Sequence, residues 1–144
     1  GGKIRFDHYH CGFEIRALYS LYKSLKIESL KSSYQHYFNF YNTHLFKDNF
    51  IPLIRPNRLY PIDIHACAES ILCRATLLPD HPTQKQALFK TLQWVNENME
   101  YRPGEYAYKK TKKIGFAITS KIPMIRWGQA WMLRALVELE KQIG

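Results

Sequence analysis

The stretch from Tyr60 to Leu78, YPIDIHACAESILCRATLL, decides the fold of this chain. After its proline, small and apolar residues occupy several faces of a helix-compatible run from Ile62 to Leu78, so we expect this helix to be buried. The first turn of the run carries Asp63 and His65. A polar pair at the start of a buried helix predicts either a cap with core hydrogen bonds or part of a ligand site.

Two other apolar runs begin in the same way. Asp7-His8-Tyr9-His10 precedes a predicted helix over Phe13–Lys26, and Arg126-Trp127-Gly128-Gln129 opens a predicted helix over Trp127–Ile143. The runs Glu28–Phe46 and Thr83–Met99 between them are amphipathic and therefore one-sided. This order of buried and one-sided helices predicts stacked αα-hairpins whose neighbours complete one another's core.

The remaining segments are predicted as connections. Prolines in the segment from Phe50 to Tyr60 favour an extended loop or short hairpin. Glu105–Tyr108 and Ile114–Ile118 alternate well enough for a two-stranded hairpin across the lysines between them, although a functional loop is the alternative. The predicted fold class is therefore all-α, with αα-hairpins joined by a short β-hairpin or extended loops. We expect residues 1–144 to form one domain.

The composition narrows the class of protein without naming a partner. The chain has 144 residues, 46 % of them hydrophobic, and a formal net charge of +9, which suits an acidic polysaccharide, a nucleic acid or a lipid surface. The basic residues are dispersed, so nucleic acid is the less expected partner. Three cysteines without CxxC spacing predict free thiols in a reducing compartment. No apolar run approaches the ~20 residues of a membrane span, and the predicted location is the cytoplasm, although a removed signal peptide would leave no trace.

The candidate catalytic residues are His8, His10 and Asp63. Imidazole and carboxylate groups exchange protons near neutral pH, which is what general acid-base chemistry needs. The alternative is structural, because a buried histidine needs a hydrogen-bond partner and aspartate favours helix starts. Capping is therefore the favoured role of Asp7 and a possible role of Asp63. With His65 these residues could supply metal ligands, but HxH and DxH are short and common motifs, so no metal or other cofactor is predicted.

The candidate substrate-binding residues are Tyr9, His65, Arg126, Trp127 and Gln129. An indole beside a guanidinium and an amide is suited to stacking on a sugar ring and to binding its hydroxyls or carboxylate. Trp127 and Trp131 are four residues apart on one helical face, where aromatic residues usually form core. We assign Trp131 to the core and Trp127 to the site.

These residues also resemble a known group of proteins. The closing run RWGQAWMLRALVEL, from Arg126 to Leu139, resembles the C-terminal part of the six-hairpin, or (α/α)6-toroid, carbohydrate-active superfamily. Asp7-His8-Tyr9-His10 ahead of Gly12 resembles the start of the C-terminal domain of the glucuronyl C5-epimerases. The resemblance implies a funnel lined by the N-terminal ends of the inner helices, which acts on an oligosaccharide or a uronate-containing polysaccharide.

A complete toroid has more helices than the five predicted here. The resemblance therefore implies about half a toroid, as a C-terminal fragment that lacks an N-terminal segment or as one partner of a homo-oligomer, since open apolar helix faces favour association. The predicted function is carbohydrate processing or binding, with hydrolase, lyase and epimerase chemistry all open. The alternative is a non-catalytic helical-repeat module that binds a protein or nucleic acid through its basic surface.

Overall fold

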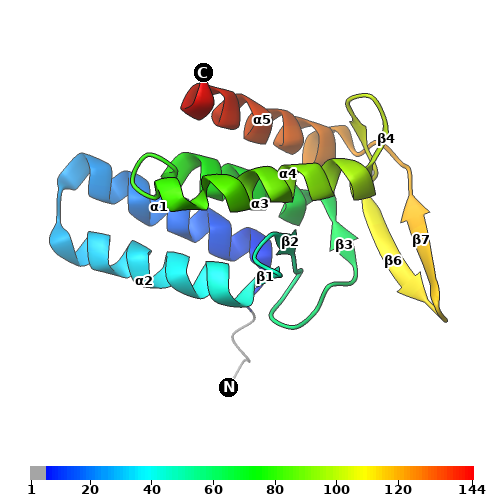
Figure 1. Cartoon of the computed structure of the whole chain (residues 1–144), viewed down its shortest axis with the longest axis horizontal. Helices are drawn as coiled ribbons and strands as arrows, with labels where there is room; N and C mark the ends of the chain where they lie inside the picture. Colours follow the sequence, from blue (N-terminus) through cyan, green and yellow to red (C-terminus); the bar gives the residue numbers. More distant parts are fainter. Residues whose placement is uncertain (1–5) are drawn as a thin grey trace.

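The structure, a computed structural model, describes residues 6–144. Five α-helices make up most of this part of the chain (Figure 1): α1 (His8–Leu25), α2 (Glu28–His44), α3 (Ile64–Leu77), α4 (Lys85–Met99) and α5 (Ala130–Ile143). Helices α1 and α2 form one antiparallel pair, and α3 and α4 form a second. Helices α3 and α5 begin next to the end of the molecule where β3, β6 and β7 lie, and α1 begins beside β1 and β2, with its N-terminal end turned toward the same side.

Local sequence explains where the helices start and stop. Asp7 caps α1 by accepting a hydrogen bond from the amide of His10, and Asp63 caps α3 by accepting one from the amide of His65. Helix α1 ends at Lys26, which adopts the left-handed conformation typical of a helix C-terminus. A short 3-10 turn, η1 (Pro82–Gln84), leads into α4, and a π-helical turn, η2 (Ile125–Gln129), leads into α5.

Seven short strands form three small antiparallel sheets among the described residues. Strands β1 (Phe46–Lys47) and β2 (Ile51–Pro52) pair after α2, and β4 (Glu100–Arg102) pairs with β5 (Glu105–Tyr106) after α4. The third sheet has the order β3 (Ile62–Asp63), β6 (Lys109–Lys113) and β7 (Phe116–Ser120). It joins the start of α3 to the hairpin that precedes α5, and it forms one wall of the candidate site described below.

The prediction of an all-α fold is wrong. In residues 6–144, 62 % of positions are helical and 17 % are strand, so the fold is mixed α/β. Ile62 and Asp63 pair with β6 instead of starting the helix, and the lysines from 109 to 113 form β6 itself instead of the loop of a hairpin. Pairing with neighbouring strands determines that both segments are extended, because a run of lysines has little β-propensity of its own.

The buried side chains form two clusters. The α1–α2 cluster contains residues of α1, α2 and the end of α3: Cys11, Ile15, Tyr19, Tyr34, Phe38, Tyr41, Leu45, Phe46, Cys73 and Leu77. The α3–α5 cluster packs α3 against α4 and α5, and includes Ile64, Ile71, Leu88, Val95 and Met132. Helix α3 contributes to both clusters, and the predictions that it is buried and that all three cysteines are free are confirmed.

The described residues include no helix that is long and apolar enough to cross a bilayer. The connection over Phe50–Tyr60 is, as predicted, irregular, with only β2 and an isolated bridge between Arg55 and Arg58.

Candidate functional site

An aromatic cluster forms where the N-terminal ends of α1 and α3 meet the start of α5. The ring of Tyr9 lies 3.8 Å from the imidazole of His65, measured between ring centroids. The imidazole is edge-on to the indoles of Trp127 and Trp131, at 5.7 and 5.1 Å. We call these four residues the aromatic cluster. Three of them were predicted site residues that lie far apart in the sequence.

His65 has an uncommitted nitrogen inside this cluster. Its Nε2 is shielded from solvent and has no hydrogen-bond partner among residues 6–144. A buried polar atom without a partner costs free energy, so such an atom in a native site calls for a ligand or water. Burial is the largest influence on the imidazole and lowers its pKa, although Asp63 opposes the shift. The ring is therefore neutral at neutral pH and can accept a hydrogen bond or a proton.

An open hollow of about 330 Å³ lies beside the imidazole, and its lining residues are Asp63, His65, Tyr108, Met124 and Trp127. Trp127 is 53 % exposed, so its ring is available to a ligand. The hollow therefore combines aromatic faces with a carboxylate and an imidazole, which is the usual equipment of a small polar binding site.

The rim of the hollow carries a cation. Lys109 Nζ lies 3.6 Å from Asp63 Oδ2 and 4.9 Å from the centre of the Tyr108 ring. Asp63 Oδ1 accepts the capping hydrogen bond from His65 N at 2.9 Å. Asp63 therefore caps α3, as predicted, and also lines the hollow.

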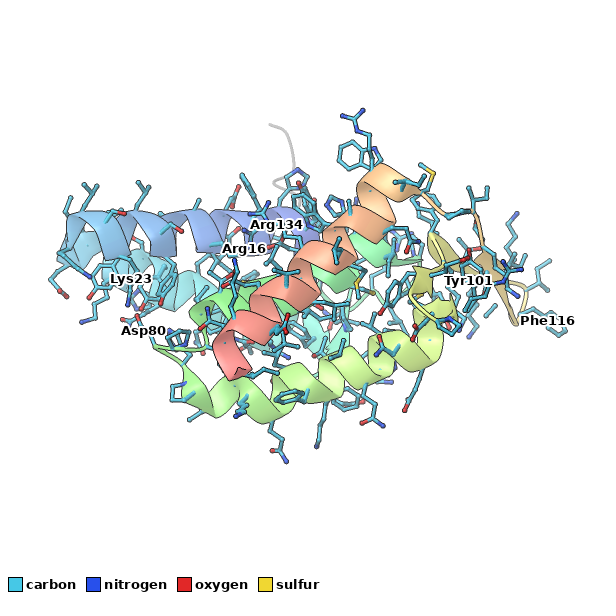
Figure 2. The ribbon with its side chains drawn as sticks, turned by 90° about the horizontal axis from the view of Figure 1, so that it is seen from above. Arg16, Lys23, Asp80, Tyr101, Phe116 and Arg134 are labelled. Carbon is cyan, nitrogen blue, oxygen red and sulfur yellow. The ribbon has the colours of Figure 1, made fainter. Side chains whose placement is uncertain are left out.

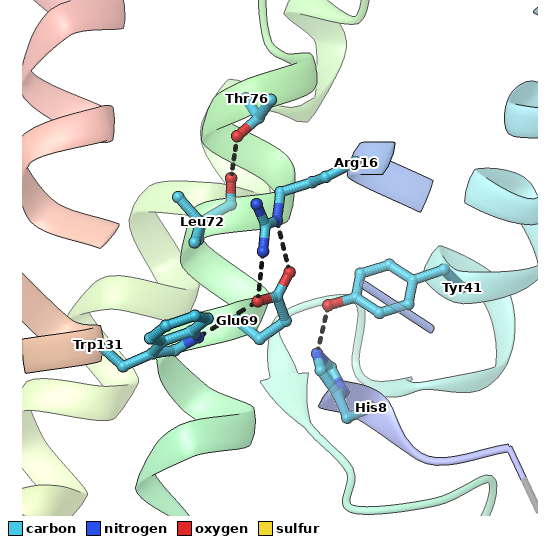
Figure 3. Close-up of polar contacts among 7 residues, drawn as sticks. All are labelled: His8, Arg16, Tyr41, Glu69, Leu72, Thr76 and Trp131. Atoms are coloured by element: carbon cyan, nitrogen blue, oxygen red, sulfur yellow. Dashed lines mark hydrogen bonds and ion pairs between the residues drawn. The ribbon is translucent and has the colours of Figure 1, made fainter. Parts of the chain in front are cut away.

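His8, one of the predicted catalytic residues, lies in the core and does not line the hollow. Its Nδ1 donates to the carbonyl of Leu53 at 3.0 Å, and its Nε2 accepts from the hydroxyl of Tyr41 at 2.6 Å (Figure 3). Full burial lowers the pKa of His8 to about 3. With both nitrogens bonded and the ring neutral, His8 has no free atom for catalysis or for a metal ion.

His10 lies on the outer surface of α1. Its Nδ1 donates to the Asp7 carboxylate at 2.8 Å, and its side chain is 67 % exposed. Asp7 therefore binds both the amide and the ring of His10, and the prediction that Asp7 is a cap is confirmed. Because the chain is already helical at His8, three successive side chains point in three directions, and only Tyr9 faces α3.

The predicted site residues at the start of α5 also differ in their positions, and only one of them lines the hollow. Gln129 is committed to the backbone of Tyr106, from which its Oε1 accepts at 3.1 Å and to which its Nε2 donates at 2.7 Å. It orders β5 and is not free to bind a ligand. Arg126 is exposed and does not line the hollow, whereas Trp127 does.

A buried ion pair lies behind the aromatic cluster. Glu69 is fully buried, and Arg16 binds it through two hydrogen bonds of 2.7 and 3.0 Å (Figure 3). Trp131 Nε1 donates to the same carboxylate at 3.3 Å. A Cβ at Gly12 would lie 2.6 Å from Glu69 Cγ, so glycine is needed for this close approach of α1 to α3. The pair fixes Trp131, which supports the assignment of that indole to the core.

Sequence reasoning missed Tyr108, Lys109 and Met124 as site residues. Tyr108 and Lys109 were assigned to a hairpin, and only the pairing of β6 with β3 brings them beside Asp63. The available signal was the run Tyr106-Ala107-Tyr108, in which aromatic residues stand next to the lysines.

Metal ligation finds no support in the described part of the chain. No group of three His, Cys, Asp or Glu side chains in residues 6–144 is placed to hold an ion.

Comparisons with family models, curated proteins and solved structures returned no match to this chain.

Proposed function

We propose that this chain binds an acidic oligosaccharide or polysaccharide in the hollow beside the aromatic cluster. The observation that carries the proposal is His65, whose Nε2 is unpaired and whose side chain packs among aromatic rings and lines an open space. Aromatic faces stack on the apolar face of a sugar ring, and an imidazole that accepts hydrogen bonds suits sugar hydroxyls. The convergence of Tyr9, His65 and Trp127 favours this function over that of a helical-repeat interaction module.

The cations at this end of the molecule favour an anionic sugar. Lys109 lies at the rim of the hollow, and Arg126 is next to Trp127 in the sequence. A guanidinium or ammonium group recognises a carboxylate through charge-assisted hydrogen bonds, so a uronate is the preferred unit. The sequence resemblance to the glucuronyl C5-epimerases points to the same class of substrate.

The same site is equipped for proton abstraction. A neutral imidazole near physiological pH is a suitable general base, and the C–H next to a uronate carboxylate is the acidic position of such a sugar. We therefore assign His65 the role of base, in place of His8. Trp127, which lines the hollow, would hold the sugar ring against the imidazole, and Tyr9, which stacks on the imidazole, would hold His65 in place.

Binding can be tested by saturation-transfer NMR with uronate and neutral oligosaccharides. Trp127→Ala should weaken uronate binding about tenfold, because it removes the exposed ring of the hollow. Leu133→Ala, which truncates an exposed apolar residue of α5, is the matched control and should leave binding unchanged. Absence of saturation transfer to every glycan would refute the proposed function.

Proton abstraction has a separate readout. In D2O the wild-type protein should exchange the proton next to the uronate carboxylate for deuterium. His65→Gln should weaken uronate binding and should lose the exchange even at a uronate concentration that saturates the variant. If His65→Gln exchanged as fast as the wild type, another group would be the base.

A further inference from the structure

The segment from Lys109 to Trp127, KKTKKIGFAITSKIPMIRW, has an unusual composition. It contains six cations, Lys109, Lys110, Lys112, Lys113, Lys121 and Arg126, and no acidic residue. The rest of the chain mixes both signs of charge. This segment therefore carries a local positive potential well above the average of the surface.

The same segment holds much of the exposed apolar surface of the molecule. Six large apolar side chains in it are more than half exposed: Ile114 98 %, Phe116 78 %, Ile125 75 %, Ile122 62 %, Trp127 53 % and Ile118 52 %. A patch of this kind on a protein surface usually marks an interaction site.

The β6–β7 hairpin presents this surface at its tip. Lys113 pairs with Phe116 across the turn, and Ile114 and Gly115 form the turn with φ angles of 43° and 84°. The hairpin projects from the helical body in Figure 1, and Figure 2 places Phe116 at the far edge of the molecule. A β-branched residue with positive φ is unfavourable, and complete exposure adds a second cost. Both costs are concentrated in Ile114.

The lysines divide between the base and the tip of the hairpin. At the base, Lys109 pairs with Asp63 and Lys110 donates to the carbonyl of Asn98. At the tip, Lys112 and Lys113 are exposed. The base is thus fixed to the body, while the cations next to the apolar tip are available to a partner.

This arrangement fits an anionic bilayer better than other partners. A bilayer offers hydrocarbon to Ile114 and Phe116 and anionic headgroups to the adjacent lysines. Nucleic acid and acidic glycans offer charge but no hydrocarbon. A second copy of the chain would bring one cationic tip against another.

We propose that the β6–β7 hairpin docks on an anionic lipid surface, with Ile114 and Phe116 inserted at the interface and Lys112 and Lys113 at the headgroups. This inference does not depend on the proposed glycan site. It also needs no membrane-spanning helix, because only the tip enters the bilayer.

Co-sedimentation of the 144-residue chain with vesicles tests the proposal. Binding is expected to phosphatidylcholine vesicles that contain phosphatidylserine and to be much weaker with phosphatidylcholine alone. Lys112→Gln with Lys113→Gln should weaken binding about thirtyfold, since each lysine near such a surface contributes to the affinity. Ile114→Ser with Phe116→Ser should weaken it at least about tenfold.

Matched double variants separate the hairpin from general charge and hydrophobicity. Lys85→Gln with Lys90→Gln removes the same charge from exposed positions of α4, and Leu21→Ser with Leu25→Ser removes exposed apolar side chains from α1. Both should bind like the wild type and, like the hairpin variants, retain the wild-type far-UV circular dichroism spectrum.

Four results would overturn the proposal. The first is no binding to either vesicle, and the second is equal losses in the hairpin variants and their controls. The third is a dimer in sedimentation velocity that the hairpin variants abolish, with vesicle binding absent. The fourth is tight binding of a single-stranded RNA that depends on Lys112 and Lys113 but not on Ile114 and Phe116, again with vesicle binding absent.

Discussion

Three neighbouring residues in the first turn of α1 have three different environments. His8 is in the core, Tyr9 stacks on His65, and His10 bonds to Asp7 at the surface. A helix turns by about 100° per residue, so residues that share one face in a strand are separated here. The three side chains therefore have different environments because α1 starts at His8, five residues before its predicted start.

His8 makes the stability of the fold depend on pH. Its folded pKa of about 3 lies below its ordinary value of 6.5, so the unfolded state binds the proton more readily. The neutral ring contributes its full stability above about pH 6.5, and the contribution falls as pH decreases towards 3. The expected slope approaches about 1.4 kcal/mol per pH unit below the unfolded pKa. Urea unfolding at pH 7, 6 and 5 measures it.

Two substitutions assign that slope to His8. His8→Gln should be less stable at pH 7 but should lose less stability between pH 7 and 5. His10→Gln, at the exposed neighbour, should keep the wild-type slope. Burial also lowers the pKa values of His65 and His81, so part of the slope should remain in every variant. An unchanged slope in His8→Gln would show that folding does not lower the pKa of His8.

At the scale of elements, one buried arginine connects three segments to α3. Arg74 is fully buried, and its guanidinium lies 3.6 Å from the centre of the Phe46 ring. The same guanidinium donates hydrogen bonds to Asn42 of α2, Thr91 of α4 and Asn49 of the β1–β2 turn. Its hydrogen-bond partners are all neutral side chains, and burial lowers its pKa to about 10. Hydrogen bonds and the aromatic face thus take the place of a counterion.

Arg74→Met should therefore cost about 2–4 kcal/mol, because it removes the donor to the buried hydroxyl of Thr91 and to the half-buried amide oxygen of Asn42 while filling much of the same volume. The free energy of unfolding from urea titration measures the loss. Lys23→Met removes a cation from an exposed ion pair with Asp80 and should leave the midpoint unchanged. If both variants unfolded at the wild-type midpoint, the guanidinium would not hold these segments together.

The sequence predicted the elements that have a periodic signal of their own. The five helices, the free cysteines, the caps at Asp7 and Asp63 and the contrast between Trp127 and Trp131 followed from local patterns. Strand β3 is only two residues long and β6 is mostly lysine, so neither pattern indicates a strand until its partner is known. The same reason explains why Tyr108 and Lys109 were not predicted as site residues. They reach the hollow only through the pairing of β6 with β3.

At the scale of the whole molecule, α3 belongs to both hydrophobic clusters. One side of α3, including Cys67 and Ile71, packs with α4 and α5, and another side, including Cys73 and Leu77, packs with α1 and α2. A helix shared in this way couples the two halves, because neither cluster can lose α3 without exposing the side chains of the other. The described residues should therefore unfold as one cooperative unit.

One truncation in each cluster tests the coupling. Leu77→Ala in the α1–α2 cluster and Leu88→Ala in the α3–α5 cluster both remove a fully buried side chain and should each cost about 2–5 kcal/mol. Tryptophan fluorescence reports the α3–α5 side, where Trp94 and Trp131 lie, whereas far-UV circular dichroism reports all the helices.

Both signals should move together to lower urea in either variant, since α3 transmits the loss from one cluster to the other. Leu77→Ala is the more demanding case, because Leu77 belongs to the cluster that holds neither indole. If Leu77→Ala shifted the circular dichroism transition and left the fluorescence transition in place, the two clusters would be separate folding units. Helix α3 would then be a contact between them rather than their common core.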